Sequence, residues 1–425
     1  MSNNLEVILW GTRIGFIHYE PYYPYTTFEY DTAFLKSNIQ LSPFYMPLGS
    51  KLYNFPFLTD EPFFNLPGLV VESLPTSFGN VIWNNYLLSK GKNLQDLTPI
   101  DKLRFLGKRG MGALEYSQKE DKEIDEVIEV NKIASLAHEV LLSTDSTRLL
   151  PTSSLEYNIL FQNGILASGD TPKILVSYND ETKEIRSGLN TLKKGFTPCL
   201  LKFDNTQNGV RDRKQKSIIE YVYYNMAVDA GINMMPSYLI EKDGYYHFCT
   251  RRFDRTIDNK KLHMQSLGSL MHKSYVDKYA CSYEKASDVL KSLGVYPKDI
   301  VELYRRMVFN ILTVNEDDNV NNFSCLMDKE GQYRLSPAYD LTFSPSIDDG
   351  HKMTINNKRS EFNNIDLIFA GKHMGLKDKE CIKIVRQVGE VIKNFAYYAH
   401  EYGVTNYNID LIQDKIKENS SAIWY

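Results

Sequence analysis

The sequence predicts an α+β fold, with a small sheet-rich lobe and a larger, mainly helical lobe. Residues 5–30 alternate and are rich in aromatic and β-branched side chains, which is typical of a meander of short strands in an N-terminal mixed β domain. More strand-like segments follow between residues 165 and 255. From about residue 285 the pattern is mainly helical, apart from the segment around 322–345.

Composition narrows the class of protein. The chain of 425 residues is long enough for two or three domains of roughly 100–200 residues each. Its net charge of −4 gives no overall attraction to nucleic acid. Five scattered cysteines without a C-x-x-C pair favour reduced thiols in a cytosol. No basic leader precedes an apolar run, and no apolar stretch approaches about 18 residues, so we expect a cytoplasmic protein without membrane contact.

The first third of the chain predicts helices and one further strand. We expect helices at residues 80–91 and 98–110 and a strand at 110–117. Residues 118–140 carry many charges among apolar residues at helical spacing, which predicts a solvated connecting helix. A polar, proline-containing stretch within residues 141–165 predicts a domain boundary.

The middle of the chain predicts two hairpins, a strand and a helix. The segments ILVSYND and EIRSGLN predict a hairpin, and PCLLKFD predicts a strand. The helix SIIEYVYYNMAVDAGI is expected to end at Gly231, because glycine is a common helix C-cap. The run PSYLIEKDGYYHFCTRRFD predicts a second hairpin that turns at Asp243 and Gly244.

The stretch NEDDNVNNFS, residues 315–324, contains several acidic and amide side chains close together, and it lies between two apolar runs. Such side chains are costly to bury unless a charged group meets them. Asp317 and Asn322 have the spacing D-x-x-x-x-N, and Asp340 follows a predicted hairpin. Phosphoryl transfer uses this set of groups, because one carboxylate accepts the hydroxyl proton while an amide and a second carboxylate hold Mg²⁺. One face of the preceding helical segment is apolar, at Leu303, Met307, Ile311 and Val314.

Two other interpretations of this stretch remain open. Asp317, Asn319 and Asn321 fit the D-x-N-x-N opening of a Ca²⁺ loop, but Asn322 and Asp328 stand where that loop requires Gly and Glu. The second interpretation is a polar surface turn without a function.

A lysine inside an apolar strand is a second candidate functional residue. Lys202 lies within PCLLKFD, where its charge is costly without an anionic partner. Glu220, on the following helix, could pair with Lys202 and orient it toward nucleotide phosphates. The alternative is a snorkelling strand-edge lysine and an exposed helix glutamate.

Two more segments have both a functional and a plain interpretation. The glycine turn in ASGDTPKILVS, residues 167–177, can offer backbone N–H groups to phosphate or be an ordinary turn. The run RRFDR, residues 251–255, is either a surface salt-bridge cluster or a hinge that contacts a nucleotide base.

In order and approximate spacing, these segments resemble the HipA family, and the resemblance runs across nearly the whole chain. In the N-terminal part it rests on FEYDTAFLKSN, LSPFYMPL, FFNLPGLVVESLP and FLGKRGMGALEY. In the catalytic part GDTPKILV is similar to the phosphate loop of the family, LLKF to its ATP-lysine strand, and EDDNVNNFS to its catalytic loop. SPAYDL is similar to the metal-binding aspartate segment, and FCTRRFDR and HMQSL are particularly close to their counterparts.

The resemblance implies a protein-kinase-like bilobal fold and a role for each matching residue. Asp317 would be the catalytic base, and Asn322 and Asp340 would be Mg²⁺ ligands. Lys202, with Glu220 as its expected partner, would bind the α and β phosphates of ATP. The remaining nucleotide contacts, from the phosphate loop to the adenine region, would be Gly169, Asp170, Thr171, Lys173 and Gln265.

The chain departs from the family pattern at two positions. Asn319 stands where the family commonly has a histidine two positions after the base, and we expect activity to be retained because that histidine often stabilises the loop. Leu166 stands where some members autophosphorylate a serine, which argues against self-inactivation at that position.

The family implies a function and partners as well. The expected protein is a Mg²⁺/ATP-dependent serine/threonine kinase toxin that phosphorylates a protein of the translation machinery and binds a helix-turn-helix antitoxin, with DNA contacted only through that antitoxin. Residues 1–145 would form a HipA N-terminal-like subdomain, residues 146–262 the ATP-binding small-lobe core, and residues 263–425 the helical kinase lobe. Two alternatives remain: an antitoxin-binding corepressor with ATP as a structural ligand, and a small-molecule kinase.

Overall fold

The computed structural model separates into two compact units. One, the N-terminal unit, comprises Met1–Arg213 and Tyr238–Met264, and the other, the C-terminal unit, comprises Lys214–Ser237 and Gln265–Tyr425. The predicted division at residues 145/146 and 262/263 into three domains stays a prediction. The structure describes residues 4–20, 22, 25–116, 127–142, 152–166, 171–189, 192–204, 214–347 and 350–423.

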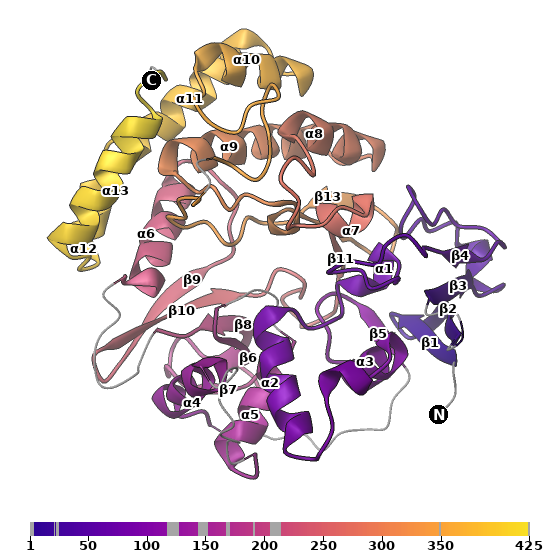
Figure 1. Cartoon of the computed structure of the whole chain (residues 1–425). Coiled ribbons are helices and arrows are strands. Elements are labelled where there is room, and N and C mark those ends of the chain that lie inside the picture. The colour runs from indigo at the N-terminus through magenta and orange to yellow at the C-terminus, as the bar shows by residue number, and fades with distance from the viewer. Residues whose placement is uncertain are drawn as a thin grey trace. The chain divides into compact units, whose positions relative to one another are not determined.

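The first sheet of the N-terminal unit has the strand order β4-β3-β2-β1-β5 (Figure 1). Its strands are β1 (Asn4–Leu9), β2 (Thr12–Glu20), β3 (Tyr25–Tyr30), β4 (Tyr53–Asn54) and β5 (Leu114–Tyr116). The pairs β1–β2 and β2–β3 are antiparallel. Along β1 every second side chain is buried, which is the period of a strand with one face on a core. The predicted meander of residues 5–30 is therefore confirmed.

The second sheet has the order β7-β6-β8-β10-β9. Its strands are β6 (Lys173–Tyr178), β7 (Ile185–Ser187), β8 (Thr197–Lys202), β9 (Ser237–Lys242) and β10 (Tyr245–Arg251). Both predicted hairpins and the predicted strand are confirmed. Between β9 and β10, Asp243 and Gly244 have φ angles of 50° and 82°, the left-handed values that a two-residue hairpin turn requires.

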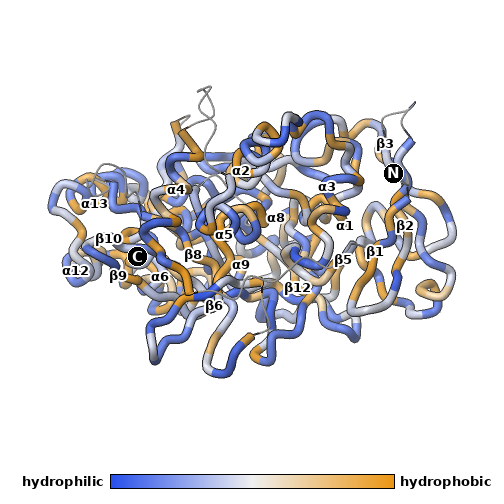
Figure 2. Tube along the Cα trace, turned by 90° about the horizontal axis from the view of Figure 1, so that it is seen from below, coloured by the Kyte–Doolittle hydropathy of each residue, from blue (hydrophilic) through white to orange (hydrophobic). Residues whose placement is uncertain are grey.

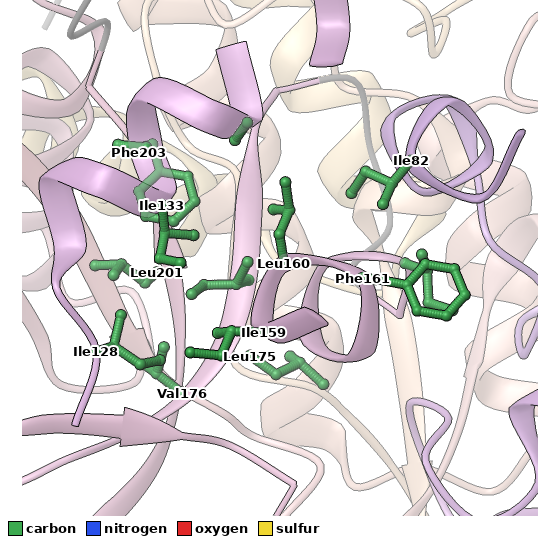
Figure 3. Packing of buried hydrophobic residues seen from close by; sticks show 14 of the residues in the cluster. Ile82, Ile128, Ile133, Ile159, Leu160, Phe161, Leu175, Val176, Leu201 and Phe203 are labelled. Atoms are coloured by element: carbon green, nitrogen blue, oxygen red, sulfur yellow. The ribbon is translucent and has the colours of Figure 1, made fainter. Parts of the chain in front are cut away.

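The helices of the N-terminal unit are α1 (Gly68–Val71), α2 (Ser77–Leu88), α3 (Pro99–Leu106), α4 (Val130–Leu142) and α5 (Leu155–Gly164), with short 3₁₀ turns at Phe34–Ser37 and Leu94–Asp96. Helix α3 packs against strands of the first sheet, whereas α5 packs against β6 of the second sheet and α2 and α4 pack against α5. Figure 3 shows Ile133 of α4, Leu160 of α5 and the strand residue Leu201 within one cluster of buried side chains. Full burial of one such side chain contributes about 1.5–3 kcal/mol.

One prediction about this region needs correction. Helix α4 was expected to be solvated, but Val130, Ile133 and Val140 are buried in the core, because its apolar residues fall on one helical face. Helix α5 lies inside the stretch 141–165 and belongs to the same core, and the domain boundary expected in that stretch stays a prediction. The early part of the predicted helix, residues 118–126, lies outside the described residues.

The C-terminal unit is mainly helical, as predicted. Its helices are α6 (Lys216–Asp229), α7 (Leu267–Met271), α8 (Tyr283–Ser292), α9 (Pro297–Thr313), α10 (Asn364–His373), α11 (Asp378–Ile392), α12 (Phe395–Glu401) and α13 (Asn406–Asn419). Strands β12 (Ser324–Met327) and β13 (Tyr333–Leu335) form an antiparallel hairpin, and β11 spans His263–Ser266. Gly231 follows α6 with φ 80°, which confirms the predicted helix end.

Hydrophobic and hydrophilic residues alternate along the chain on a short length scale (Figure 2). Among the described residues, none of the helices combines the length and the apolar character that a bilayer crossing requires.

Candidate active site

The predicted catalytic loop follows directly after α9. Val314 adopts a left-handed conformation, with φ 59°, and its N–H donates to the carbonyl oxygens of Asn310 and Ile311, which ends the helix. The predicted apolar face of this helix is buried at Leu303, Met307, Ile311 and Val314. Because this face anchors α9 in the core, the helix C-terminus holds the start of the loop in a fixed place. The loop then forms a 3₁₀ turn, η5 (Val320–Asn322).

The three consecutive acids of this loop have different surroundings. Asp317 is exposed, whereas Glu316 and Asp318 retain only 9% and 1% of their surface. A buried carboxylate is costly unless hydrogen bonds replace its water. The two flanking acids should therefore have a structural role, and Asp317 is the acid that a substrate could reach.

Asp318 meets that requirement with neighbours from the C-terminal unit. The Tyr283 hydroxyl donates to Oδ2 over 2.7 Å, and the Nδ1 atom of His351 lies 2.9 Å from the same oxygen. The backbone N–H of Lys352 donates to Oδ1 over 2.8 Å. Asp318 therefore fastens the chain around residue 352 to the catalytic loop.

Glu316 fastens an earlier part of the same stretch. Its Oε2 atom accepts a hydrogen bond from the N–H of Ser346 over 2.6 Å, and its backbone N–H donates to the Ser344 carbonyl over 3.0 Å. The acids on both sides of Asp317 thus hold the stretch that follows Asp340 against the loop.

The carboxylate of Asp317 is oriented by Asn319. The amide Nδ2 of Asn319 donates to Asp317 Oδ1 over 3.1 Å. Asp317 is exposed as a residue, but its neighbours displace part of the water around the carboxyl group, and this partial desolvation raises the pKa of Asp317. The nearby negative charges of Asp340 and Asp318 raise this pKa further, against the Asn319 hydrogen bond and the positive charge of Lys352. A carboxylate with a raised pKa accepts a proton more readily, as a general base must.

Asn322 and Asp340 offer oxygen atoms suited to Mg²⁺. The Asn322 amide nitrogen donates to the Asp317 carbonyl over 2.7 Å, which leaves the Oδ1 atom of Asn322 for a cation. Asp340 lies near enough to Asp317 to raise the pKa of that carboxyl. Among the described residues, no group of three or more His, Cys, Asp or Glu side chains could hold a metal by itself. The residues fit Mg²⁺, which in nucleotide sites takes one or two carboxylates and completes its shell with phosphate and water.

The calcium-loop interpretation does not fit this geometry. Asp328, which would be its last ligand, lies in the β12–β13 turn, where its Oδ1 atom accepts the backbone N–H groups of Glu330 and Gln332. A strand separates it from the first acids of the loop. Asp328 therefore closes a hairpin turn.

In the N-terminal unit, Lys202 and Lys173 occupy directly opposite positions on β8 and β6. Opposite residues of an antiparallel pair lie on the same face, where like charges repel. Lys173 is 3% exposed and Lys202 is half-buried, with its Nζ atom 5.8 Å from the Phe248 ring centroid. Two lysines on one face of the sheet give that face a positive charge, which suits an anion such as a phosphate. Of the predicted phosphate-loop residues, Thr171 is half-buried, whereas Gly169 and Asp170 lie outside the described residues.

The predicted nucleotide-binding residues of the C-terminal unit are both buried. Glu220 retains 9% of its surface on α6, so the alternative of an exposed helix glutamate is wrong. Its pairing with Lys202, a residue of the other unit, stays a prediction. Gln265 is fully buried, and within the described part of the chain neither atom of its amide has a hydrogen-bond partner. Because an unsatisfied buried amide is rare and costly, a hydrogen-bonding ligand is a reasonable partner for Gln265.

The run RRFDR forms a buried ion cluster, so the surface interpretation is wrong. Asp254 is fully buried and accepts hydrogen bonds from Arg252 and Arg255 over 2.7 Å each. Burial alone would raise the pKa of Asp254, but the two guanidinium groups outweigh it and hold this pKa far below its usual range. Asp254 also accepts the Gly112 N–H over 2.8 Å, so the cluster binds the segment before β5 to the end of β10.

Four residues that the sequence did not single out belong to the loop assembly: Glu316, Asp318, His351 and Lys352. The acidic run was visible in the sequence. No local signal indicated which acid faces solvent or that the chain near residue 352 returns to it.

Family models match both parts of the chain. The HipA N-terminal domain matches residues 5–117, and the HipA-like C-terminal domain matches residues 165–395. No curated protein gives a match.

Solved structures resemble the fold. HipA of Shewanella oneidensis MR-1, determined with HipB and operator DNA, is 17% identical, with a TM-score of 0.68 over 98% of this chain and 96% of that chain. The proinflammatory kinase CtkA of Helicobacter pylori is 14% identical, with a TM-score of 0.40 over 60% of this chain and 90% of that chain. The expected α+β fold is confirmed, and it is the fold of the Shewanella HipA structure. Because the C-terminal model alone spans more than half of the sequence, the chain belongs to the HipA family.

Proposed function

We propose that this protein is a Mg²⁺/ATP-dependent serine/threonine protein kinase. The main support is the arrangement of the loop after α9, where Asp317 is exposed between two buried acids and is oriented by Asn319. The oxygen donors of Asn322 and Asp340 accompany it on the same unit. A polar surface turn without a function would not need two buried acids to hold one exposed acid in place.

Each residue has a defined part in the proposed reaction. Asp317 accepts the proton of the substrate hydroxyl as its oxygen attacks the γ-phosphorus of ATP. Asn322 and Asp340 would hold Mg²⁺, which when bound neutralises charge on the phosphate oxygens. Lys202 and Lys173 bind phosphate from the second sheet, together with Gly169, Asp170 and Thr171, and Gln265 serves the adenine region. Positioning and charge neutralisation supply most of the rate.

We further propose that the protein acts as a cytoplasmic toxin with a protein antitoxin. The similar Shewanella protein was solved with HipB and its operator DNA. By analogy, a helix-turn-helix antitoxin is the proposed partner here, and a protein of the translation machinery is the proposed substrate. The net charge of −4 favours DNA contact through the antitoxin rather than through this chain. The five described cysteines are buried and free, as in a reducing cytoplasm.

The test is phosphate transfer from radiolabelled ATP to a translation extract by the Asp317→Ala and Asp340→Ala variants. We expect transfer to fall roughly 100-fold to 10,000-fold for Asp317→Ala, since it loses the proton acceptor. Asp410→Ala, which removes an exposed aspartate on α13, is the matched control. Circular dichroism establishes that the variants fold. Full activity in both site variants would refute the kinase assignment, and calorimetric binding of MgATP without turnover would favour the corepressor.

A further inference from the structure

Lys352 lies in the stretch that the acids beside Asp317 hold in place. Its backbone N–H donates to Asp318 Oδ1 over 2.8 Å and to the Glu316 carbonyl over 3.1 Å. The backbone of this lysine is therefore fixed by both neighbours of the predicted base.

The side chain of Lys352 differs from those beside it. His351 and Met353 are 1% and 0% exposed, whereas Lys352 is only partly buried. Its positive charge is close enough to lower the pKa of Asp317 against the stronger effect of lost water. With the residues that the structure describes, its ammonium group makes no ion pair. The lysine thus brings a cation beside a cluster of acids that phosphate groups would approach.

We propose that Lys352 is a further catalytic residue, whose ammonium group binds the γ-phosphoryl group of ATP while it is transferred. This inference rests on the proposed kinase function. Lys352 lies outside the catalytic loop and outside the sequence motifs, because it comes after the predicted metal ligand Asp340 in the chain. The sequence alone therefore does not select this residue.

The chemistry of the step explains why a cation belongs there. The bond between the γ-phosphorus and the β,γ-bridging oxygen breaks as the substrate hydroxyl oxygen bonds to the γ-phosphorus. The hydroxyl proton passes to the Asp317 carboxylate, and ADP leaves with the bridging oxygen and its electron pair. Negative charge is spread over the three other γ-oxygens in the transition state. A fixed ammonium group beside those oxygens stabilises that charge, and lysine is a common point-charge ligand of phosphate.

The experiment compares Lys352→Ala, Lys352→Arg and wild type by calorimetry with MgATP and MgADP and by single-turnover transfer. A γ-phosphoryl contact predicts that Lys352→Ala binds MgATP several-fold more weakly while its affinity for MgADP is unchanged. It also predicts a loss of roughly 100-fold in transfer rate, in the range seen when one preorganised charge contact is removed. Lys352→Arg keeps the charge and should restore part of both quantities.

The control is Lys329→Ala, which removes the same charge from the exposed β12–β13 turn and should match wild type. Should Lys352→Ala fail to fold, Lys352→Gln removes the charge and keeps most of the side chain. The role of Lys352 is overturned if the alanine or glutamine variant keeps both the wild-type ratio of MgATP to MgADP affinity and the wild-type transfer rate. The kinase function would still stand in that case. Wild-type protein that neither binds MgATP nor transfers phosphate overturns both.

Discussion

Asp317 carries a raised pKa because the folded protein removes water from its carboxylate and places other carboxylates nearby. The folded state therefore holds this proton more tightly than the unfolded chain does. The free energy of unfolding should fall as the pH rises from the ordinary aspartate pKa, about 3.9, through the raised pKa of Asp317. At neutral pH the ionised base thus lowers stability, a cost that is common at functional sites.

Replacement of this carboxylate tests that cost. Asp317→Asn keeps an oxygen that can accept the Asn319 hydrogen bond but carries no charge. We expect its melting temperature to exceed that of wild type at pH 7, and the difference to shrink as the pH falls below about 4, where the wild-type carboxyl is protonated in both states. Scanning calorimetry at both pH values measures this, with Asp410→Asn as the exposed control. If Asp317→Asn is less stable than wild type by the same amount at both pH values, this prediction is wrong.

The ion cluster that joins β10 to the segment before β5 sets stability at the scale of elements. Arg252 and Arg255 are 5% and 9% exposed, and Asp254 is their shared carboxylate. Burial also lowers the pKa of Arg255, to about 10, because desolvation disfavours its charge. Each buried guanidinium group needs the Asp254 carboxylate to balance its charge. The cluster is therefore stable only when all three side chains are present.

Removal of Asp254 should accordingly be severe. Asp254→Ala leaves two buried guanidinium groups and the Gly112 N–H without this partner, and breaking a buried pair costs about 3–5 kcal/mol. Urea denaturation measures the loss. Asp258→Ala is the matched control, because its ion pair with Lys260 is exposed to solvent and should contribute little to stability. Similar losses in the two variants would show that the buried cluster does not hold these elements together.

For the molecule as a whole, nucleotide binding should appear as stability. A ligand that binds only the folded state stabilises it by about 2.7 kcal/mol at 100 times its dissociation constant. MgATP should therefore raise the melting temperature of wild-type protein, and addition of EDTA should reverse most of the rise. Asp340→Ala should show a smaller response to Mg²⁺ at constant ATP. Differential scanning fluorimetry measures the shift with MgATP, its reversal by EDTA and the response of Asp340→Ala. If ATP raises the melting temperature equally with and without Mg²⁺ in every variant, this result would argue against the metal site.

Short-range patterns were enough for much of this fold. Alternation in residues 5–30 predicted the first strands, and the left-handed preference of Gly231 and Gly244 predicted a helix end and a turn. The spacing of Asp317 and Asn322 selected a loop that the structure places at the end of α9. These signals depend on residues within one turn of helix or a few strand positions, so they can be recognised in the sequence before any partner is known.

The burial of polar residues was decided by tertiary structure. Nothing local distinguishes Asp317 from Asp318, yet one is exposed and the other is bound by Tyr283 and His351, which lie far away in the sequence. In the same way, the sequence around Asp254 is compatible with a surface ion cluster. Only the folded structure shows that Asp254 is buried and accepts a hydrogen bond from the distant Gly112 N–H. The sequence by itself determined which elements form and where a phosphoryl-transfer loop should lie. Only the tertiary structure decided which acids are structural and which lysine accompanies the base, because the free energy of a buried charge depends on partners that the fold brings from distant positions.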